Sequence, residues 1–229
     1  MKILIPPSEG KSLINTSSVK FKNTDYKFNS EVKGIIKMLN NCKPDDLQKI
    51  YGTSIEKCNE LHNHNLNVFE SECSMSMERY TGVVYNYLDP SSLEKKSYDF
   101  LRENFLITSA LFGLVSPNDL LPFYKLKMNV LRLHEYWNPI FTEYLKKEEL
   151  IIDLLPEIHR KSYKSKNILK INFFFKKKGK VVSSGHNGKA IKGKYLRYIV
   201  ENQITTIEGF KSYSQDGFMW HEKGFLKEI

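Results

Sequence analysis

Short apolar runs alternate with amphipathic stretches along this chain, and the alternation predicts strands and helices in turn. Apolar runs that end at prolines, glycines or polar turns are typical of buried strands. Such runs predict strands at residues 1–5, 106–114, 151–155, 168–175 and 180–184. Apolar residues at helical spacing predict helices at residues 30–42, 45–50, 55–62, 91–104, 137–145 and 189–203.

Two local patterns refine these boundaries. Ser91 and Glu94 have the spacing of a capping box, in which each side chain bonds the other residue's backbone amide, so we expect a helix to begin there. Residues 176–179, three lysines and a glycine, separate the last two predicted strands and predict a β-hairpin. The elements follow one another without a linker, repeat or low-complexity tract. We therefore expect residues 1–229 to form a single α/β domain with a mixed β-sheet flanked by helices.

Composition supports a globular chain with an uneven charge. Hydrophobic residues make up 41% and aromatic residues 13%, enough for a real core. The formal net charge is +9, and residues 158–200 contain 13 Lys or Arg but no Asp or Glu. The remaining residues, 22 basic and 26 acidic, carry a net charge of −4. Because the excess charge lies in one block, we expect a surface that faces a polyanion, with a merely solvated lysine-rich face as the alternative.

Two glycine–lysine junctions are candidate anion contacts. Gly10-Lys11-Ser12 follows a predicted strand, but the glycine that a phosphate loop needs five residues earlier is Ile5. We therefore reject a nucleotide-hydrolysing P-loop and retain Lys11 as a single anion contact. Residues 185–189, which read Gly-His-Asn-Gly-Lys, lead from a strand into a helix, where glycines permit close approach and the helix N-terminus favours anions.

Residues 47–61 resemble a helix-hairpin-helix, in which a glycine turn points backbone amides at a DNA phosphate. Lys49, Gly52, Thr53 and Ser54 form the turn region, and Ser54 replaces the usual second glycine. Any short helical hairpin would look similar, so a purely structural hairpin is an equal alternative.

Cysteine, metal and membrane patterns are weak. Cys58, His62, His64 and Cys73 do not have the paired spacing of zinc ligands, so we expect no metal, and no pattern for a cofactor stands out. Three cysteines without a C-x-x-C pair fit reduced thiols. No apolar run reaches the roughly 20 residues of a membrane span, and the first is too short for a signal peptide. We expect a cytoplasmic protein without membrane contact, and a monomer.

Several motifs together resemble the YaaA family of peroxide stress resistance proteins. They are Ile3-Leu4-Ile5-Pro6-Pro7-Ser8-Glu9-Gly10-Lys11, Tyr80-Thr81-Gly82, Leu111-Phe112-Gly113-Leu114-Val115-Ser116-Pro117-x-Asp119, Tyr124-Lys125-Leu126-x-Met128, His186-Asn187-Gly188-Lys189-Ala190-Ile191-Lys192-Gly193, and Gly217-Phe218. Their order and spacing are far more specific than any one motif, and they span nearly the whole chain. The family usually has Arg where this chain has Lys125 and Lys192, which keeps the charge but loses the bidentate fork.

The resemblance implies a family-specific α/β fold, and a helix-hairpin-helix and basic cleft that bind DNA during resistance to hydrogen peroxide. We expect contacts to phosphates of duplex or structured DNA without sequence specificity. The expected nucleic-acid-binding residues are Lys11, Lys49, Gly52, Thr53, Ser54, Lys125, Lys189, Lys192, Lys194 and Arg197. The alternative is an enzyme acting on a nucleotide or nucleic-acid base, for which the candidate catalytic residues are Asp119, Tyr124, Lys125 and Lys189.

Overall fold

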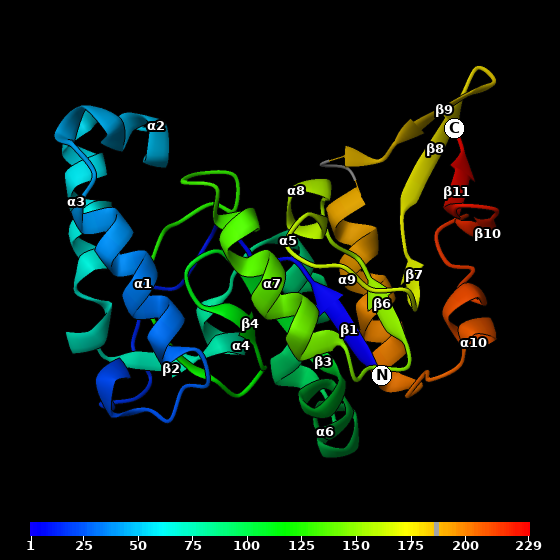
Figure 1. The fold of residues 1–229 in the computed structure, drawn as a ribbon. Helices are drawn as coiled ribbons and strands as arrows, with labels where there is room; N and C mark the ends of the chain where they lie inside the picture. The colour runs from blue at the N-terminus through cyan, green and yellow to red at the C-terminus, as the bar shows by residue number, and fades with distance from the viewer. Residues whose placement is uncertain (186–187) are drawn as a thin grey trace.

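The computed structural model describes residues 1–185 and 188–229, which form an α/β fold with mixed sheets flanked by helices, as predicted (Figure 1). The main sheet has five strands in the order β4-β3-β1-β6-β7. Strands β1, β3, β6 and β7 run parallel, and β4 runs antiparallel to β3. Its strands are β1 (Lys2–Ile5), β3 (Phe105–Ser109), β4 (Gly113–Val115), β6 (Ile151–Asp153) and β7 (Ile168–Lys170).

A second sheet has four strands in the order β10-β11-β8-β9, and a separate pair joins β2 to β5. The predicted hairpin is confirmed as β8 and β9, whereas residues 168–170, predicted as part of its first strand, belong to the main sheet as β7. These strands are β8 (Phe173–Lys177), β9 (Lys180–Ser183), β10 (Met219–His221), β11 (Gly224–Glu228), β2 (Cys73–Met75) and β5 (Leu120–Pro122).

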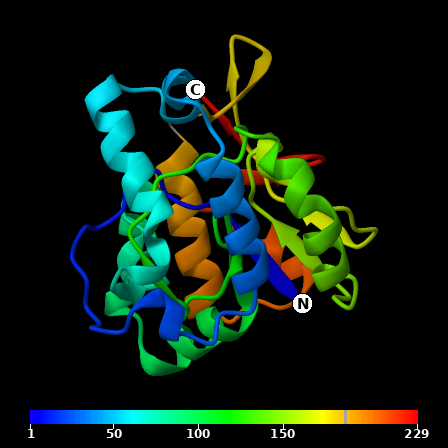
Figure 2. The same cartoon turned by 60° about the vertical axis from the view of Figure 1, so that its left-hand side comes forward.

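Helices surround the main sheet. Figures 1 and 2 show α7 and α9 on opposite sides of β1, and α9 packs against α5 and α6. The α-helices are α1 (Asn29–Asn40), α2 (Leu47–Tyr51), α3 (Ile55–Leu66), α4 (Ser76–Arg79), α5 (Val83–Leu88), α6 (Lys95–Asn104), α7 (Leu133–Leu145), α8 (Glu157–Arg160), α9 (Gly188–Glu201) and α10 (Ile207–Lys211). Short 3-10 helices are η1 (Phe21–Asn23), η2 (Pro44–Asp46), η3 (Val68–Glu70) and η4 (Pro90–Ser92).

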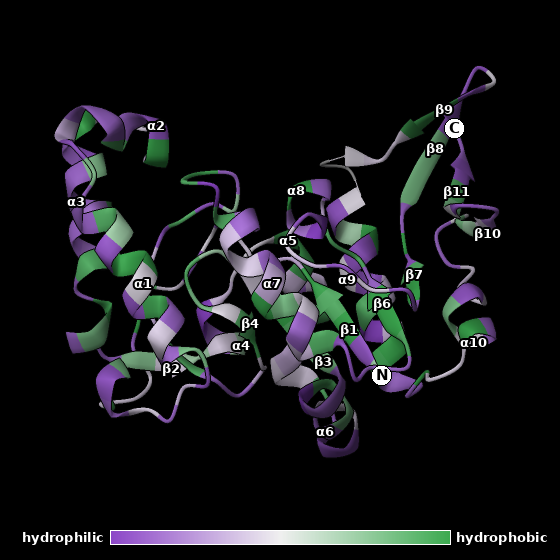
Figure 3. Cartoon of the chain, viewed as in Figure 1, coloured by the Kyte–Doolittle hydropathy of each residue, from purple (hydrophilic) through white to green (hydrophobic). Residues whose placement is uncertain are grey.

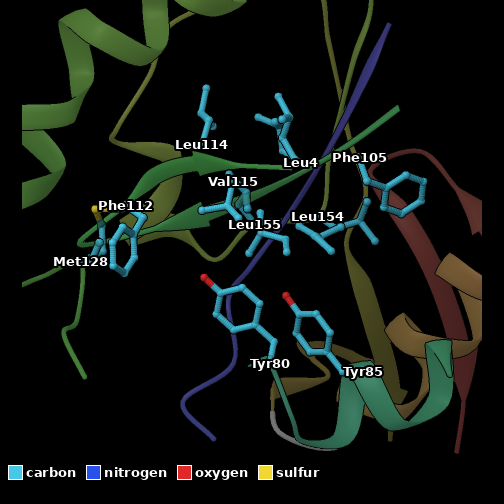
Figure 4. Packing of buried hydrophobic residues seen from close by; sticks show 14 of the residues in the cluster. Leu4, Tyr80, Tyr85, Phe105, Phe112, Leu114, Val115, Met128, Leu154 and Leu155 are labelled. Carbon is cyan, nitrogen blue, oxygen red and sulfur yellow. The ribbon is translucent and has the colours of Figure 1, made fainter. Parts of the chain in front are cut away.

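Strand β1 lies at the centre of the main sheet and is apolar because both of its faces are covered. Ile3, Leu4 and Ile5 are fully buried, which explains why this strand lacks polar alternation (Figure 3). Tyr80 and Tyr85 stack side by side beneath this part of the sheet, with ring centroids 5.5 Å apart (Figure 4). The Tyr85 hydroxyl donates to the Pro6 carbonyl at 2.8 Å and so fixes the chain where it leaves β1.

The single strand predicted at residues 106–114 is wrong, because the chain reverses inside this apolar run. Ser109 Oγ accepts the backbone N–H groups of Leu111 and Phe112 at 3.2 and 3.0 Å, which closes a tight turn. Gly113 has φ +75°, a conformation that glycine adopts without steric cost. Both strands and the turn are buried, so hydropathy alone gives no sign of the reversal.

The helix predicted to begin at Ser91 is also corrected. It is α6 and begins at Lys95, while Ser91 lies in η4. The Ser91 hydroxyl donates to Asp89 Oδ1 at 2.9 Å instead of capping α6. Pro90, with its fixed φ, starts the 3-10 turn that carries Ser91 away from the helix axis.

Candidate nucleic-acid interface

A cleft of about 920 Å³ opens at the carboxyl ends of strands β1 and β6. The chain leaves β1 for β3 on one side and later reaches β6 on the other, so β1 is a topological switch point. Loops diverge at such a point and leave a crevice outside the strand ends, where ligands of open α/β sheets bind. The walls come from the loop after β1, the start of α5, the segment after β5, α8 with the residues before it, the base of the β8–β9 hairpin, and the start of α9.

The fold brings four of the predicted lysines into this cleft. Lys11 follows β1, Lys125 follows β5, and Lys189 and Lys192 lie in the first turns of α9. Lys127 and Arg160 also line the cleft and were not among the predicted site residues. The lining contains six Lys or Arg side chains against two Glu, which makes the cleft basic and suits it to an anionic ligand.

Lys11 is the most enclosed of these amines. Its Nζ donates to the Ser8 carbonyl at 2.7 Å and lies 4.3 Å from the centroid of the Tyr124 ring. Burial lowers the pKa of Lys11 from 10.5 to about 7, with a further decrease from the positive charge of Lys125 and an opposing effect of Glu9. A substantial fraction of this amine is therefore neutral near pH 7, unlike an ordinary lysine.

The Glu9 side chain balances part of the positive charge of Lys125 and Lys127. Its carboxylate lies 3.8 Å from Lys125 Nζ and 4.0 Å from Lys127 Nζ, and Lys125 Nζ also donates to the Glu9 carbonyl at 2.9 Å. Because Glu9 is largely exposed, these ion pairs are weak, and an anionic ligand can replace the carboxylate.

A buried ion pair supports the part of the cleft that α8 and the start of α9 form. Asp153, at the end of β6, accepts Arg160 Nε at 3.1 Å and the Tyr163 hydroxyl at 2.7 Å. Lys192 Nζ donates to the Leu154 carbonyl at 3.3 Å, and burial together with the charge of Arg160 lowers the pKa of Lys192. Asp153 thus fixes Arg160, and the end of β6 holds Lys192 at the cleft.

His159 also lines this part of the cleft. Its Nδ1 lies 2.8 Å from Thr108 Oγ1, and burial lowers its pKa to about 4. The imidazole is therefore neutral at pH 7 and adds no charge to the cleft.

Two candidate catalytic residues lie outside the cleft lining. The Tyr124 hydroxyl bonds to the hydroxyls of Tyr80 and Ser109 at 2.8 and 2.7 Å, and burial raises its pKa to about 12. It is therefore poorly suited to give up a proton at neutral pH, although its ring supports Lys11. Asp119 follows β4, the antiparallel strand that carries the chain away from the carboxyl ends of the parallel strands. The Asp119 carboxylate accepts the Ser116 N–H at 2.7 Å.

Lys194 and Arg197, which we expected at the cleft, point elsewhere. Lys194 pairs with Asp216 at 2.7 Å, and Arg197 pairs with Glu201 at 2.8 Å and donates to Ser92 Oγ at 2.9 Å. Neither lines the cleft. At about 100° per residue, Lys189 and Lys192 share one side of α9, and residues 194 and 197 fall on another.

The predicted helix-hairpin-helix region is a pair of short helices, α2 and α3, joined by residues 52–54. Gly52 ends α2 with φ +66°, and a Cβ added there would meet no atom within 4 Å. Ser54 caps α3 by accepting the Lys57 N–H, and Thr53 is exposed between them. The Lys49 side chain on α2 is 81% exposed. A side chain added at position 52 would therefore face open space, while the Gly52 N–H itself donates to the Gln48 carbonyl at 2.8 Å.

The α2–α3 pair is tied to the cleft by one buried amide side chain. Asn65 Oδ1 accepts the Lys125 N–H at 2.9 Å, and its Nδ2 donates to the Lys125 carbonyl at 2.7 Å and to the Tyr51 hydroxyl at 3.0 Å. Sequence reasoning missed Asn65. The available signal was a polar residue at helical spacing from Cys58 and Leu61, within the apolar stripe of α3.

The glycine–lysine junction before α9 is described only in part. Residues 186 and 187 of the predicted motif lie outside the described residues. Gly188 begins α9, and a Cβ added there would collide with Ser184. Glycine at position 188 therefore lets the start of α9 approach Ser184 closely, and this approach places Lys189 at the cleft.

Across residues 1–185 and 188–229, no helix has the length and apolarity to cross a bilayer. No cluster of three or more His, Cys, Asp or Glu side chains suited to a metal ion occurs in these two segments. Cys42, Cys58 and Cys73 are free thiols.

The fold and the cleft together define an α/β protein with a basic crevice at a topological switch point. Residues 1–224 match the family described as peroxide stress protein YaaA, and the chain belongs to this family. Membership confirms the resemblance found in the sequence and gives the chain a role in the oxidative stress response.

The chain is also similar to bacterial proteins of comparable length. An uncharacterized protein of Campylobacter jejuni subsp. jejuni is 34% identical over 218 residues, which cover 89% of this chain and 86% of that protein. A UPF0246 protein of Fusobacterium nucleatum subsp. nucleatum is 27% identical, over 99% of this chain and 98% of its own length. A UPF0246 protein of Finegoldia magna is 24% identical, over 100% and 96%.

Proposed function

We propose that this protein binds DNA during the response to hydrogen peroxide and contacts phosphates through the cleft and the α2–α3 turn. The observation that carries the proposal is the convergence of Lys11, Lys125, Lys189 and Lys192, from three separate segments, on one basic cleft. Lysine ammonium groups neutralise phosphates without reading bases. The partner is therefore duplex or structured DNA, bound with strong salt dependence and little sequence preference.

The placement of the α2–α3 pair supports a shared binding surface. Lys49 borders a smaller hollow, and Asn129 lines both this hollow and the cleft, so the two adjoin. Figures 1 and 2 show the α2–α3 pair and the β8–β9 hairpin rising from the same side of the molecule. Helix α8 and the start of α9, which line the cleft, lie between them. A duplex that rests on this side meets the α2–α3 turn and the cleft together.

Replacing Gly52 with valine is expected to lower the duplex affinity of the folded protein several-fold. The loss of free energy of unfolding should be the smaller effect. A β-branched residue at positive φ costs roughly 1–2 kcal/mol. The valine side chain would also occupy the open space through which a phosphate reaches the turn amides. The measurements are duplex affinity by fluorescence anisotropy and the free energy of unfolding by chemical denaturation.

Gly179→Val is the matched control for this variant. Gly179 also has positive φ, +77°, and a Cβ added there would likewise meet no atom within 4 Å. It lies at the tip of the β8–β9 hairpin, outside the proposed contacts, so its valine variant should show similar backbone strain with wild-type DNA affinity. Equal affinities of the folded Gly52 variant and the wild type would refute the proposed contact at the α2–α3 turn.

A second candidate function is an enzyme that acts on a nucleotide or a nucleic-acid base. The observation that favours it is the enclosed Lys11 amine with its pKa of about 7, in a cleft large enough for a nucleotide. Binding and turnover of free nucleotides would support this function, whereas duplex binding without turnover would support the first.

A further inference from the structure

The Lys11 amine is held at a fixed position in the cleft. The backbone on either side of it is pinned, since Thr81 N donates to the Gly10 carbonyl at 3.1 Å and Ser12 N donates to the Arg79 carbonyl at 2.9 Å. Beneath the amine lies the buried Tyr124 ring, whose hydroxyl is fixed by its two hydrogen bonds. Such support orients a reactive group without requiring it to be ordered when a ligand binds.

The surroundings of this amine suit a nucleophile better than a simple charge contact. Burial, Lys125 and Arg79 all favour the neutral form, and Glu9 opposes them. A neutral amine has a free lone pair, and lysines desolvated beside other cations are the ones that form imines with carbonyl compounds. The other cleft lysines, Lys125 and Lys189, add positive charge to the same cleft for the phosphates of a ligand.

We propose that Lys11 forms an imine with the aldehyde of a deoxyribose that has lost its base. Oxidative attack on DNA leads to base loss, and the exposed deoxyribose opens to an aldehyde at C1′ with a phosphate on each side. This sugar is small enough for the cleft, and its two phosphates suit the basic lining. The inference rests on the proposed DNA-binding function, which would deliver the damaged site to Lys11.

The chemical step needs no redox partner. The lone pair of Lys11 Nζ attacks C1′, so an N–C bond forms and the carbonyl electron pair moves to oxygen. A proton passes from nitrogen to that oxygen. A second proton, taken from solvent, lets the hydroxyl leave as water, which breaks the C–O bond. The products are a protonated imine and water. Borohydride reagents reduce the imine to a stable secondary amine, which makes the intermediate detectable.

The test uses a duplex with a single abasic site, incubated with the full-length protein and sodium cyanoborohydride. A covalent protein–DNA adduct should appear on a denaturing gel, and peptide mass spectrometry should map it to Lys11. Lys11→Arg keeps the positive charge but should lower the adduct yield at least a hundredfold, even at duplex concentrations that saturate the variant. Lys57→Arg, at an exposed residue of α3 that bonds Glu60, should give the wild-type yield. A tetrahydrofuran site, which has no aldehyde, should give no adduct.

Three results would overturn the inference. They are an adduct that maps to the Met1 amine or another lysine, an undiminished yield in Lys11→Arg, and tight binding of the abasic duplex without any adduct. The last would leave the DNA-binding function standing. Conversely, free 2-deoxyribose 5-phosphate trapped on Lys11 in a protein that binds no duplex would support the imine chemistry and contradict the DNA-binding function.

Discussion

Replacing Lys189 and Lys192 together with alanine is expected to weaken duplex binding by about a hundredfold and to flatten its salt dependence. A hydrogen bond to a charged group contributes about 1.5–3 kcal/mol, so losing two costs about 3 kcal/mol or more. Each lost phosphate contact lowers the slope of log affinity against log salt by about one, so the slope should fall by roughly two. Binding should weaken equally for all duplex sequences, because the lost contacts read no bases.

The β8–β9 hairpin provides a control with the same change in charge. Lys177 and Lys178 lie at its turn, away from the cleft lining. Replacing both with alanine should change the affinity and the salt slope much less than the variant in α9 does. If the hairpin variant lost binding while the α9 variant kept the wild-type slope, the site would lie on the hairpin and not in the cleft.

Replacing Asn65 with alanine is expected to lower the free energy of unfolding and to weaken DNA binding together. The variant leaves the N–H and carbonyl of Lys125 without the amide that satisfies both, and unpaired polar groups of this kind cost about 1–3 kcal/mol. We expect a loss of about 2 kcal/mol, measured by chemical denaturation. DNA affinity should fall as well, because Lys125 loses the contact that positions its backbone at the cleft.

Asn63→Ala is the matched control on the same helix. The Asn63 side chain is exposed, whereas that of Asn65 is fully buried. The control should therefore keep wild-type unfolding and binding. Similar values for both variants would contradict the role assigned to Asn65 as the link between the α2–α3 pair and the cleft.

Much of the fold was accessible from the hydropathy pattern because the central elements are strongly apolar. The strand at residues 1–5 and the helix around Trp137 correspond to β1 and α7. The reversal between Ser109 and Gly113 was not accessible, because it depends on hydrogen bonds to one serine hydroxyl inside an apolar run. Strands β10 and β11 were not predicted either. They border the second sheet, where β8 pairs with β11 across a long sequence separation.

The candidate site was accessible only in part. The acid-free block and the glycine junction point to Lys189 and Lys192, but the convergence of Lys11 and Lys125 with them depends on the order of strands in the sheet. Arg160 looked like one more basic residue of the block, and its ion pair with Asp153 appears only in three dimensions. Helical periodicity could have separated Lys194 and Arg197 from the cleft lysines, since they lie on a different side of α9.

The central claim, a DNA-phosphate-binding cleft, is tested most directly by the affinity of the wild-type protein for a fluorescent duplex over a salt series. Lys125, Lys189 and Lys192, with Lys11 only partly charged, predict that log affinity falls linearly with log salt, with a slope of about −3. The slope should be the same for unrelated sequences. Binding that is absent at every salt concentration, or that is insensitive to salt, would contradict the account and favour the enzyme acting on a nucleotide.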